Sequence, residues 1–237
     1  MFEDVSLLAR STRGGDNVLV GGRRVYRRTL REQVFDRLRH EIVSGVRLPG
    51  DELSEERLAS EYGVSRGTVR EAMRALEQLR LVAGDARKSA HVHRASPREI
   101  AEIFNVRAAL EGMAASNIVS SPSRQAIVKE LQKHLPPDLM ELNFREHMNK
   151  DMHFHRRLCE FSGNSVLLEQ WCGLEDRIRI VFFSSGETQP IAIMGRCHHE
   201  PILRCIERGD ALKAQEAVRA HMQASARVWA PGVQAFG

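Results

Sequence analysis

The most constraining feature of this sequence is the stretch from residue 54 to residue 79, which predicts two short amphipathic helices joined by a tight turn. Ser54 is well placed to cap the first helix and Gly63 to end it. Ser65 can then cap a second helix. The buried stripe of this second helix is expected to be Val69, Ala72, Met73, Leu76 and Leu79. Two short helices across a glycine turn have helix-turn-helix geometry.

A longer helix precedes this pair, and two short strands follow it. Thr29 can cap the preceding helix, in which leucine, valine and isoleucine recur at helical spacing. Leu81-Val82 and His91-Val92 are expected to form two strands around a loop that carries Arg87 and Lys88. The N-terminal domain is therefore predicted to be a winged helix-turn-helix with a basic wing.

The second half of the chain predicts helices only. Aromatic residues make up only 5% of the sequence, and alternating runs of strand-favouring residues are absent. Ser96-Pro97-Arg98-Glu99 has the pattern of a capping box that starts a new helix. Later Pro and Gly residues divide the chain into six or seven antiparallel helices. The fold class is mainly α, with residues 26–94 and 95–230 as its two domains.

Positive charge is concentrated near the N-terminus. Residues 10–39 hold nine arginines and three acidic residues, a net charge of +6 against +4 for the whole chain. Glycine pairs interrupt residues 1–25, and we expect this segment to be a disordered basic arm. Such a segment suits a polyanion such as DNA, because each neutralised phosphate releases counterions.

The apolar runs and the cysteines indicate the cellular compartment in which the protein is expected. The sequence contains no run of about 18 apolar residues, the length that a membrane span requires, and no secretory signal pattern. The four cysteines form no C-x-x-C pair, which favours free thiols over disulfides. We therefore expect a cytoplasmic protein that does not bind membranes.

Residues 30–82 closely resemble the N-terminal domain of the GntR family of bacterial regulators. The matching segments are LREQVFDRLRHEIVSG, LPGDELSEERLA and YGVSRGTVREAMRALEQLRLV. The resemblance implies that this domain binds double-stranded operator DNA through the start of its second short helix and through the wing. The residues predicted to contact DNA are Ser65, Arg66, Gly67, Thr68, Arg70, Arg87 and Lys88. The wing departs from the family pattern, because Lys88-Ser89 stands where an Arg-Gly pair is usual.

Four residues of the helical half have the chemistry and spacing of metal ligands. Asp151 and His155 lie four residues apart, on successive turns of one helix face. His199 lies ten residues before the turn Gly209-Asp210, and His221 lies eleven residues after it. In a helical hairpin both imidazoles are then about 15 Å from the turn, side by side. One carboxylate and three imidazoles suit a divalent ion such as Zn²⁺ or Ni²⁺, whereas a single helix histidine is more often an ordinary core or surface residue.

Residues 97–225 resemble the helical effector domain, called FCD, of the FadR-type branch of GntR regulators. The matching pieces are Arg107-x-x-Leu110-Glu111, Asp151-x-x-Phe154-His155, Ser162-Gly163-Asn164 and the segment that ends at His221. The resemblance implies a metal held by Asp151 and the three histidines, with a small carboxylate effector beside it. Arg107 and Asn164 are the predicted effector contacts. For Arg107, an ion pair with Glu111 is an equal alternative.

These observations predict a homodimeric, ligand-responsive transcription regulator. Its two winged domains would read a palindromic operator, and a small organic acid bound near the metal would release it. One alternative is a regulator that binds its effector without a metal. A metalloenzyme is a further alternative, but no residue stands out as the general base that such an enzyme requires. We therefore do not expect an enzyme.

Overall fold

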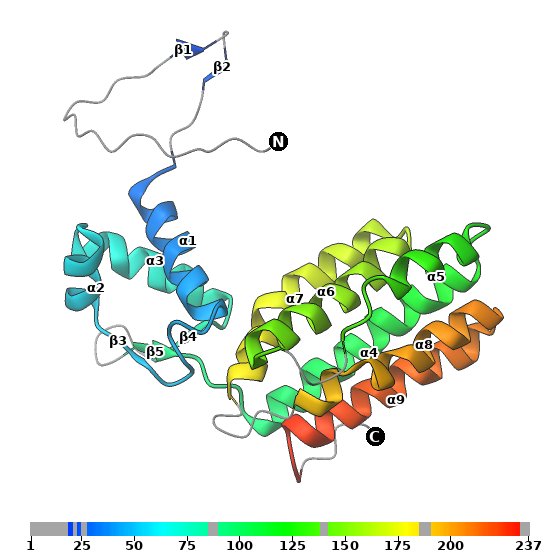
Figure 1. The fold of residues 1–237 in the computed structure, drawn as a ribbon. Helices are drawn as coiled ribbons and strands as arrows, with labels where there is room; N and C mark the ends of the chain where they lie inside the picture. The colour runs from blue at the N-terminus through cyan, green and yellow to red at the C-terminus, as the bar shows by residue number, and fades with distance from the viewer. Residues whose placement is uncertain are drawn as a thin grey trace.

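The computed structural model describes residues 19–20, 23–24, 28–84, 90–137, 142–184 and 191–232. Figure 1 shows a small N-terminal domain beside a larger bundle of long helices. Strands occur as short pieces in the described part of the chain, so the predicted mainly α class is confirmed. No described helix is long and apolar enough to cross a membrane.

The N-terminal domain consists of three helices and a three-stranded antiparallel sheet. The helices are α1 (Leu30–Val43), α2 (Glu55–Tyr62) and α3 (Arg66–Gln78). The strands are β3 (Glu52–Leu53), β4 (Val82–Ala83) and β5 (Ala90–Val92). β5 is the central strand and pairs Ala90 with Leu53 and Val92 with Val82. The hairpin of β4 and β5 is the predicted pair of wing strands, whereas β3 was not predicted.

The predicted helix starts in this domain are confirmed. Thr29 and Glu32 form a reciprocal capping box, and Ser54 and Ser65 each accept a backbone N–H of the first turn. Gly63 ends α2 with φ at 66°, in the left-handed region that favours glycine. One expectation is wrong: Leu79 is 45% exposed, because α3 ends at the residue before it.

The C-terminal domain is an antiparallel bundle. Its elements are α4 (Pro97–Val119), α5 (Arg124–Gln132), α6 (Phe144–Phe161), α7 (Ser165–Ser184), a 3₁₀ turn η1 (Ile191–Met194), α8 (Arg196–Arg208) and α9 (Ala211–Trp229). Six α-helices in the described residues agree with the predicted six or seven. Ser96 caps α4, but Glu99 does not return the bond as a capping box would; its carboxylate contacts His93 and Arg177 instead.

Part of the predicted basic arm is structured. β1 (Leu19–Val20) pairs with β2 (Arg23–Arg24) as a short antiparallel ladder. The remainder of residues 1–25 lies outside the described residues, so the expected disorder stays a prediction there.

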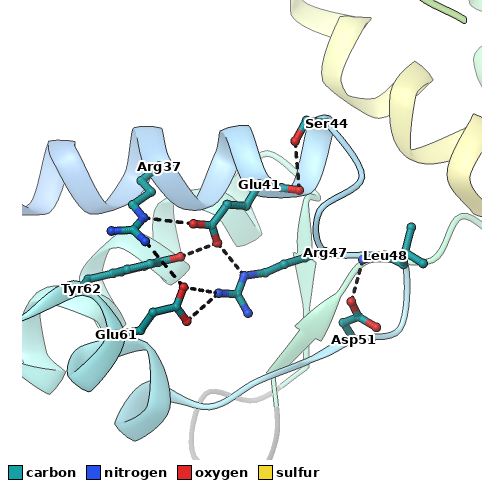
Figure 2. Close-up of polar contacts among 8 residues, drawn as sticks. All are labelled: Arg37, Glu41, Ser44, Arg47, Leu48, Asp51, Glu61 and Tyr62. Atoms are coloured by element: carbon teal, nitrogen blue, oxygen red, sulfur yellow. Dashed lines mark hydrogen bonds and ion pairs between the residues drawn. The ribbon is translucent and has the colours of Figure 1, made fainter. Parts of the chain in front are cut away.

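One partly buried carboxylate links α1 to α2 in the N-terminal domain, as Figure 2 shows. Glu41 of α1 accepts hydrogen bonds from Arg37, from Arg47 in the following turn and from the hydroxyl of Tyr62 in α2. Burial opposes the charged form, but these donors outweigh it and hold the pKa of Glu41 below its usual value. The network fixes α2 against α1, which positions the turn before α3.

The two domains meet where the end of α1 contacts the helical bundle. Gly45 has φ at 73°, and a Cβ there would lie 2.6 Å from the ring of Phe183 in α7. Arg145, near the start of α6, donates to the carbonyl oxygen of Gly45 at 2.7 Å. Arg39 also forms a two-bond ion pair with Asp176 of α7. The contact leaves no room for a side chain at Gly45 and involves the helix that carries Asp151.

Candidate metal centre and DNA-contacting helix

Four buried side chains converge inside the C-terminal bundle. Asp151 and His155 project from α6, His199 from α8 and His221 from α9, and their ligand atoms all lie within 4.8 Å of one another. This is the convergence that the sequence predicted. The hairpin at Gly209, with φ at 79°, brings α8 and α9 together as expected.

The distances between these atoms fit a shared cation. His199 Nε2 lies 3.0 Å from Asp151 Oδ1 and 3.1 Å from His155 Nε2, and His221 Nε2 lies 3.3 Å from His155 Nε2. A tetrahedral Zn²⁺ with bonds of about 2.0–2.1 Å to nitrogen holds neighbouring ligand atoms about 3.3 Å apart. The spacing of the three imidazoles therefore matches the edges of a metal coordination shell.

Two of the imidazoles are oriented through their second nitrogen. His199 Nδ1 lies 2.9 Å from the carbonyl oxygen of Gly195, which can only accept, so Nδ1 carries the proton and Nε2 keeps its lone pair. His155 Nδ1 lies 2.5 Å from Glu111 Oε2. Such partners fix the tautomer and the ring orientation of metal-ligating histidines.

Glu111 connects this cluster to the rest of the core. Its Oε1 accepts from Arg107 Nε and from the indole N–H of Trp171, both at 2.9 Å. Burial would raise the pKa of Glu111, but Arg107 and His155 outweigh it and lower the pKa to about 2. Sequence reasoning identified Glu111 only as a partner for Arg107. Its contact with His155 has no signal in residue spacing, because the two residues lie on different helices.

Asp151 and His221 are held in the protonation states that bind cations, whereas for His155 the carboxylates of Glu111 and Asp151 outweigh burial and raise the pKa. Burial opposes the charged form of Asp151, but His155 and His199 hold the pKa of Asp151 well below its usual value. Burial and the neighbouring His199 and His155 lower the pKa of His221 well below its usual value. A carboxylate and a neutral imidazole are the forms that coordinate a divalent ion.

The two predicted effector residues are both used inside the protein. Arg107 is buried and pairs with Glu111, so the structural alternative is formed, but its Nη2 has no hydrogen-bond partner among the described residues. Asn164 lies in the turn between α6 and α7, where its Oδ1 accepts from the backbone N–H of Leu167 at 3.0 Å. Effector contact stays a prediction for both, and for Asn164 the side-chain oxygen already has a capping role.

Sequence reasoning missed one further histidine on α6. His147 is completely buried, and neither of its ring nitrogens has a hydrogen-bond partner in the described part of the chain. It precedes Asp151 by four residues, which repeats the spacing from Asp151 to His155. By contrast, His153 lies on the surface and contacts His134, as expected of a residue outside the cluster.

The residues at the start of α3 that are predicted to contact DNA differ in whether their side chains already have partners within the protein. Ser65 Oγ caps the helix by accepting from Thr68 N, and it also lies 2.9 Å from Thr68 Oγ1. Arg66 is exposed and forms no ion pair within the described residues. Arg70 forms two hydrogen bonds, of 2.8 and 2.7 Å, with the nearly buried carboxylate of Glu55. Gly67 lies in the first turn.

The predicted wing contacts cannot be placed in the same way. Arg87 and Lys88 lie outside the described residues, between β4 and β5. Their role in DNA binding therefore stays a prediction. The structure describes the strands β4 and β5 on either side of them.

Two family models match this chain and leave few residues of the two domains unmatched. The FCD domain model matches residues 102–224, more than half of the chain, and the model of bacterial regulatory proteins of the gntR family matches residues 30–92. The chain belongs to the GntR family and carries an FCD domain. It is a transcription regulator, not an enzyme.

Curated relatives of this GntR regulator are regulators too. It is 27% identical over 195 residues to the uncharacterized HTH-type transcriptional regulator YdhC of Bacillus subtilis, covering 80% of this chain and 86% of that protein. It is also 27% identical to a probable D-xylose utilization operon transcriptional repressor of Paenarthrobacter nicotinovorans, covering 85% and 89%. The gluconate operon transcriptional repressor of Bacillus subtilis is 32% identical over 143 residues, 58% of this chain and 57% of that protein.

A solved structure shares the fold of this GntR regulator. A GntR transcriptional regulator from Rhodococcus sp. RHA1 superimposes with a TM-score of 0.70 at 20% identity, covering 86% of this chain and 99% of that one. At this identity the likeness concerns the fold alone, and it supports the arrangement of a helix-turn-helix domain with a C-terminal helical domain.

Proposed function

We propose that this GntR regulator is a repressor that a small carboxylate releases from its operator, and that the carboxylate binds beside a divalent metal held by Asp151, His155, His199 and His221. The observation that carries the proposal is the convergence of these four buried ligand atoms within 4.8 Å. A borderline ion such as Zn²⁺ or Ni²⁺ suits the three imidazoles and one carboxylate. When bound, such an ion would supply a positive centre that attracts the oxygen atoms of an anion.

The effector class follows from the charges around the cluster. Arg107 Nη2 is buried without a hydrogen-bond partner in the described residues, and a guanidinium matches a carboxylate in bidentate fashion. One relative is named for a gluconate operon, and gluconate is a hydroxy acid. A small hydroxy carboxylate is therefore the first effector to test.

A structural change caused by effector binding would be transmitted to the DNA-binding domain through α6 and α9. Phe144, at the start of α6, contacts both Phe183 and Trp229, with ring centroids 6.0 and 6.3 Å apart. Phe183 is the ring against which Gly45 packs. A ligand that moves α6 relative to α9 would thus change the surface on which the end of α1 rests. The effector can shift the equilibrium between the arrangement with DNA bound and the released arrangement only by the difference between its affinities for the two.

Operator binding would use Ser65, Arg66, Gly67, Thr68 and Arg70 at the start of α3, with Arg87 and Lys88 in the wing. The start of a recognition helix contacts base edges, and its backbone N–H groups favour phosphate. A homodimer would read a palindromic site, since the two-fold symmetry of the protein is matched by that of the DNA.

The test uses full-length protein purified without a chelator or a metal-affinity tag. We expect elemental analysis to find about one divalent ion per chain, as a single four-ligand site requires. An operator selected from random duplexes would then be titrated with gluconate and other small carboxylates while fluorescence anisotropy reports release. Release that needs the metal supports the proposal. Release by a carboxylate from metal-free protein would favour the metal-free alternative and leave the DNA-binding function intact.

A further inference from the structure

Buried polar atoms without partners continue beyond the metal cluster, toward the DNA-binding domain. Both ring nitrogens of His147 in α6 and the indole nitrogen of Trp229 at the end of α9 are buried, and none has a hydrogen-bond partner among the described residues. Buried polar side-chain atoms of folded proteins are nearly always hydrogen-bonded. Several such atoms in one region therefore indicate a place that receives a partner from outside the chain.

Two contacts between α6 and α9 enclose this region. At one end, the Nε2 atoms of His155 and His221 lie 3.3 Å apart within the metal cluster. At the other end, the ring centroids of Phe144 and Trp229 lie 6.3 Å apart. The two helices are thus antiparallel neighbours over this length. His147 lies between the two contacts on α6, one turn before Asp151 on the same helix face.

α9 contributes a matching row of polar side chains. His221, Ser225 and Trp229 follow one another at intervals of four residues, so they lie on one face of the helix, and all three are buried. Eight residues of α-helix rise about 12 Å, so the row extends about this far from the metal cluster. An acid as short as acetate, held at the metal, would not reach Trp229, whereas a longer acid would.

The chemistry of the unpartnered atoms selects oxygen-rich ligands. An indole N–H can only donate a hydrogen bond, and so can the guanidinium of Arg107, whose Nη2 is also buried without a partner among the described residues. A neutral imidazole such as that of His147 donates from one nitrogen and accepts at the other. A hydroxyl group does both as well, so hydroxyl groups could satisfy both residues.

A role in packing alone does not explain His147. The side chain is completely buried, and an apolar residue could fill a similar volume without leaving two polar atoms unsatisfied. Proteins keep such locally unfavourable residues mainly at functional sites. His147 therefore has the properties of a ligand-binding residue.

We propose that His147 and Trp229 form a second subsite, which binds hydroxyl groups at the far end of an acid whose carboxylate lies at the metal. The inference rests on the proposed function and narrows its effector class from small carboxylates to chain-like polyhydroxy acids. Ser225 lies between the two subsites on α9 and offers a further hydroxyl group to the middle of such a chain.

Isothermal titration calorimetry of the full-length, Zn²⁺-loaded protein with gluconate and with acetate tests this subsite. We expect gluconate to bind the unmodified protein at least tenfold more tightly than acetate. His147→Leu is expected to weaken gluconate binding at least tenfold and to leave acetate binding unchanged. Trp229→Phe keeps an aromatic ring but removes the N–H, and it should weaken gluconate binding about three- to tenfold. His153→Leu, on the surface of the same helix, is the matched control and should change neither affinity.

Thermal melting of the metal-free protein without any acid gives a second readout. His147→Leu is expected to raise the melting temperature, because it removes two unsatisfied polar atoms from the interior. A histidine with a structural role would show the opposite sign, since its loss would destabilise the fold.

The outcomes distinguish the subsite from the proposed function. Equal affinities of the unmodified protein for gluconate and acetate, or an unchanged gluconate affinity in His147→Leu, would overturn the subsite and leave the metal site and the carboxylate effector as proposed. A lower melting temperature of His147→Leu with parallel losses for both acids would assign it a structural role and also overturn the subsite. Binding of neither acid by the metal-loaded protein would overturn the proposed carboxylate effector and the subsite with it.

Discussion

The start of α3 and the interior of the C-terminal bundle hold charged groups in opposite surroundings. Arg66 is exposed and forms no ion pair among the described residues, at little energetic cost, because water solvates it. Asp151 and Glu111 are buried, and each has partners that hold its pKa low. A charge at the surface can be removed without disturbing the fold, whereas a buried charge cannot lose a partner without leaving another group unsatisfied. Substitutions of exposed charges at the start of α3 should therefore weaken binding alone. Substitutions of buried charges in the C-terminal bundle should weaken both binding and folding.

The strongest test of the buried side is His199→Ala. This change removes the imidazole that lies closest to both Asp151 and His155. We expect metal affinity to fall by more than about 100-fold, since one of four ligands is lost. Elemental analysis after dialysis measures the result. His198→Ala is the matched control, because His198 lies outside the cluster. Full metal content in the His199 variant would remove the assignment of this residue as a ligand.

Glu111→Gln tests orientation of the site without removing a ligand. The change keeps the shape of the side chain but removes the charge that faces His155 Nδ1 and Arg107. We expect metal affinity to fall by about 10- to 100-fold, the usual effect of losing such a partner. Thermal stability should fall as well, because Arg107 keeps a buried charge without a counterion. Competition with a chromogenic chelator measures affinity, and Glu102→Gln on the exposed face of α4 is the control. Unchanged affinity would contradict the orienting role.

Arg66→Ala and Arg70→Ala compare two arginines on the DNA-contacting helix. Each is expected to weaken operator binding by about 1–2 kcal/mol, roughly tenfold. Only Arg70→Ala should also lower the melting temperature, because it leaves the carboxylate of Glu55 without its partner. Fluorescence anisotropy and thermal melts give both quantities, with Arg98→Ala on α4 as a control distant from α3. If neither variant binds operator more weakly, the predicted contact surface is wrong.

Glu41→Gln is expected to have the smallest effect, a loss of about 1 kcal/mol of folding free energy at neutral pH. The pKa of Glu41 is below its ordinary value in the folded state. Its contribution is therefore complete above the unfolded pKa of about 4.5 and is lost as the pH falls through the folded pKa. Chemical denaturation followed between about pH 6 and pH 3 should show a smaller acid-induced loss for the variant. Parallel losses in both proteins would show that Glu41 carries no such linkage.

Local sequence patterns were sufficient to predict where the helices of the DNA-binding domain begin. Thr29, Ser54 and Ser65 cap the three helices as expected, since capping depends on residues three positions apart. The two-residue strand β3 was missed, because two residues are too few to show an alternating pattern. Its pairing with β5 is set by contacts that are distant in sequence.

The metal cluster was predictable for a different reason. His199 and His221 flank one hairpin at nearly equal distance, so their proximity follows from helix geometry. The contact of Glu111 with His155 depends on how α4 packs on α6, and no local pattern encodes that packing.

The close fit between Gly45 and Phe183 limits how freely the two domains could be exchanged among related regulators. A chimera that joins this N-terminal domain to another effector domain would need a ring at the position of Phe183 and a donor at that of Arg145. Without them, the carbonyl of Gly45 would lose its hydrogen bond, and the end of α1 would lose its support. Recombination between family members is thus expected to succeed most often when the acceptor already carries both residues.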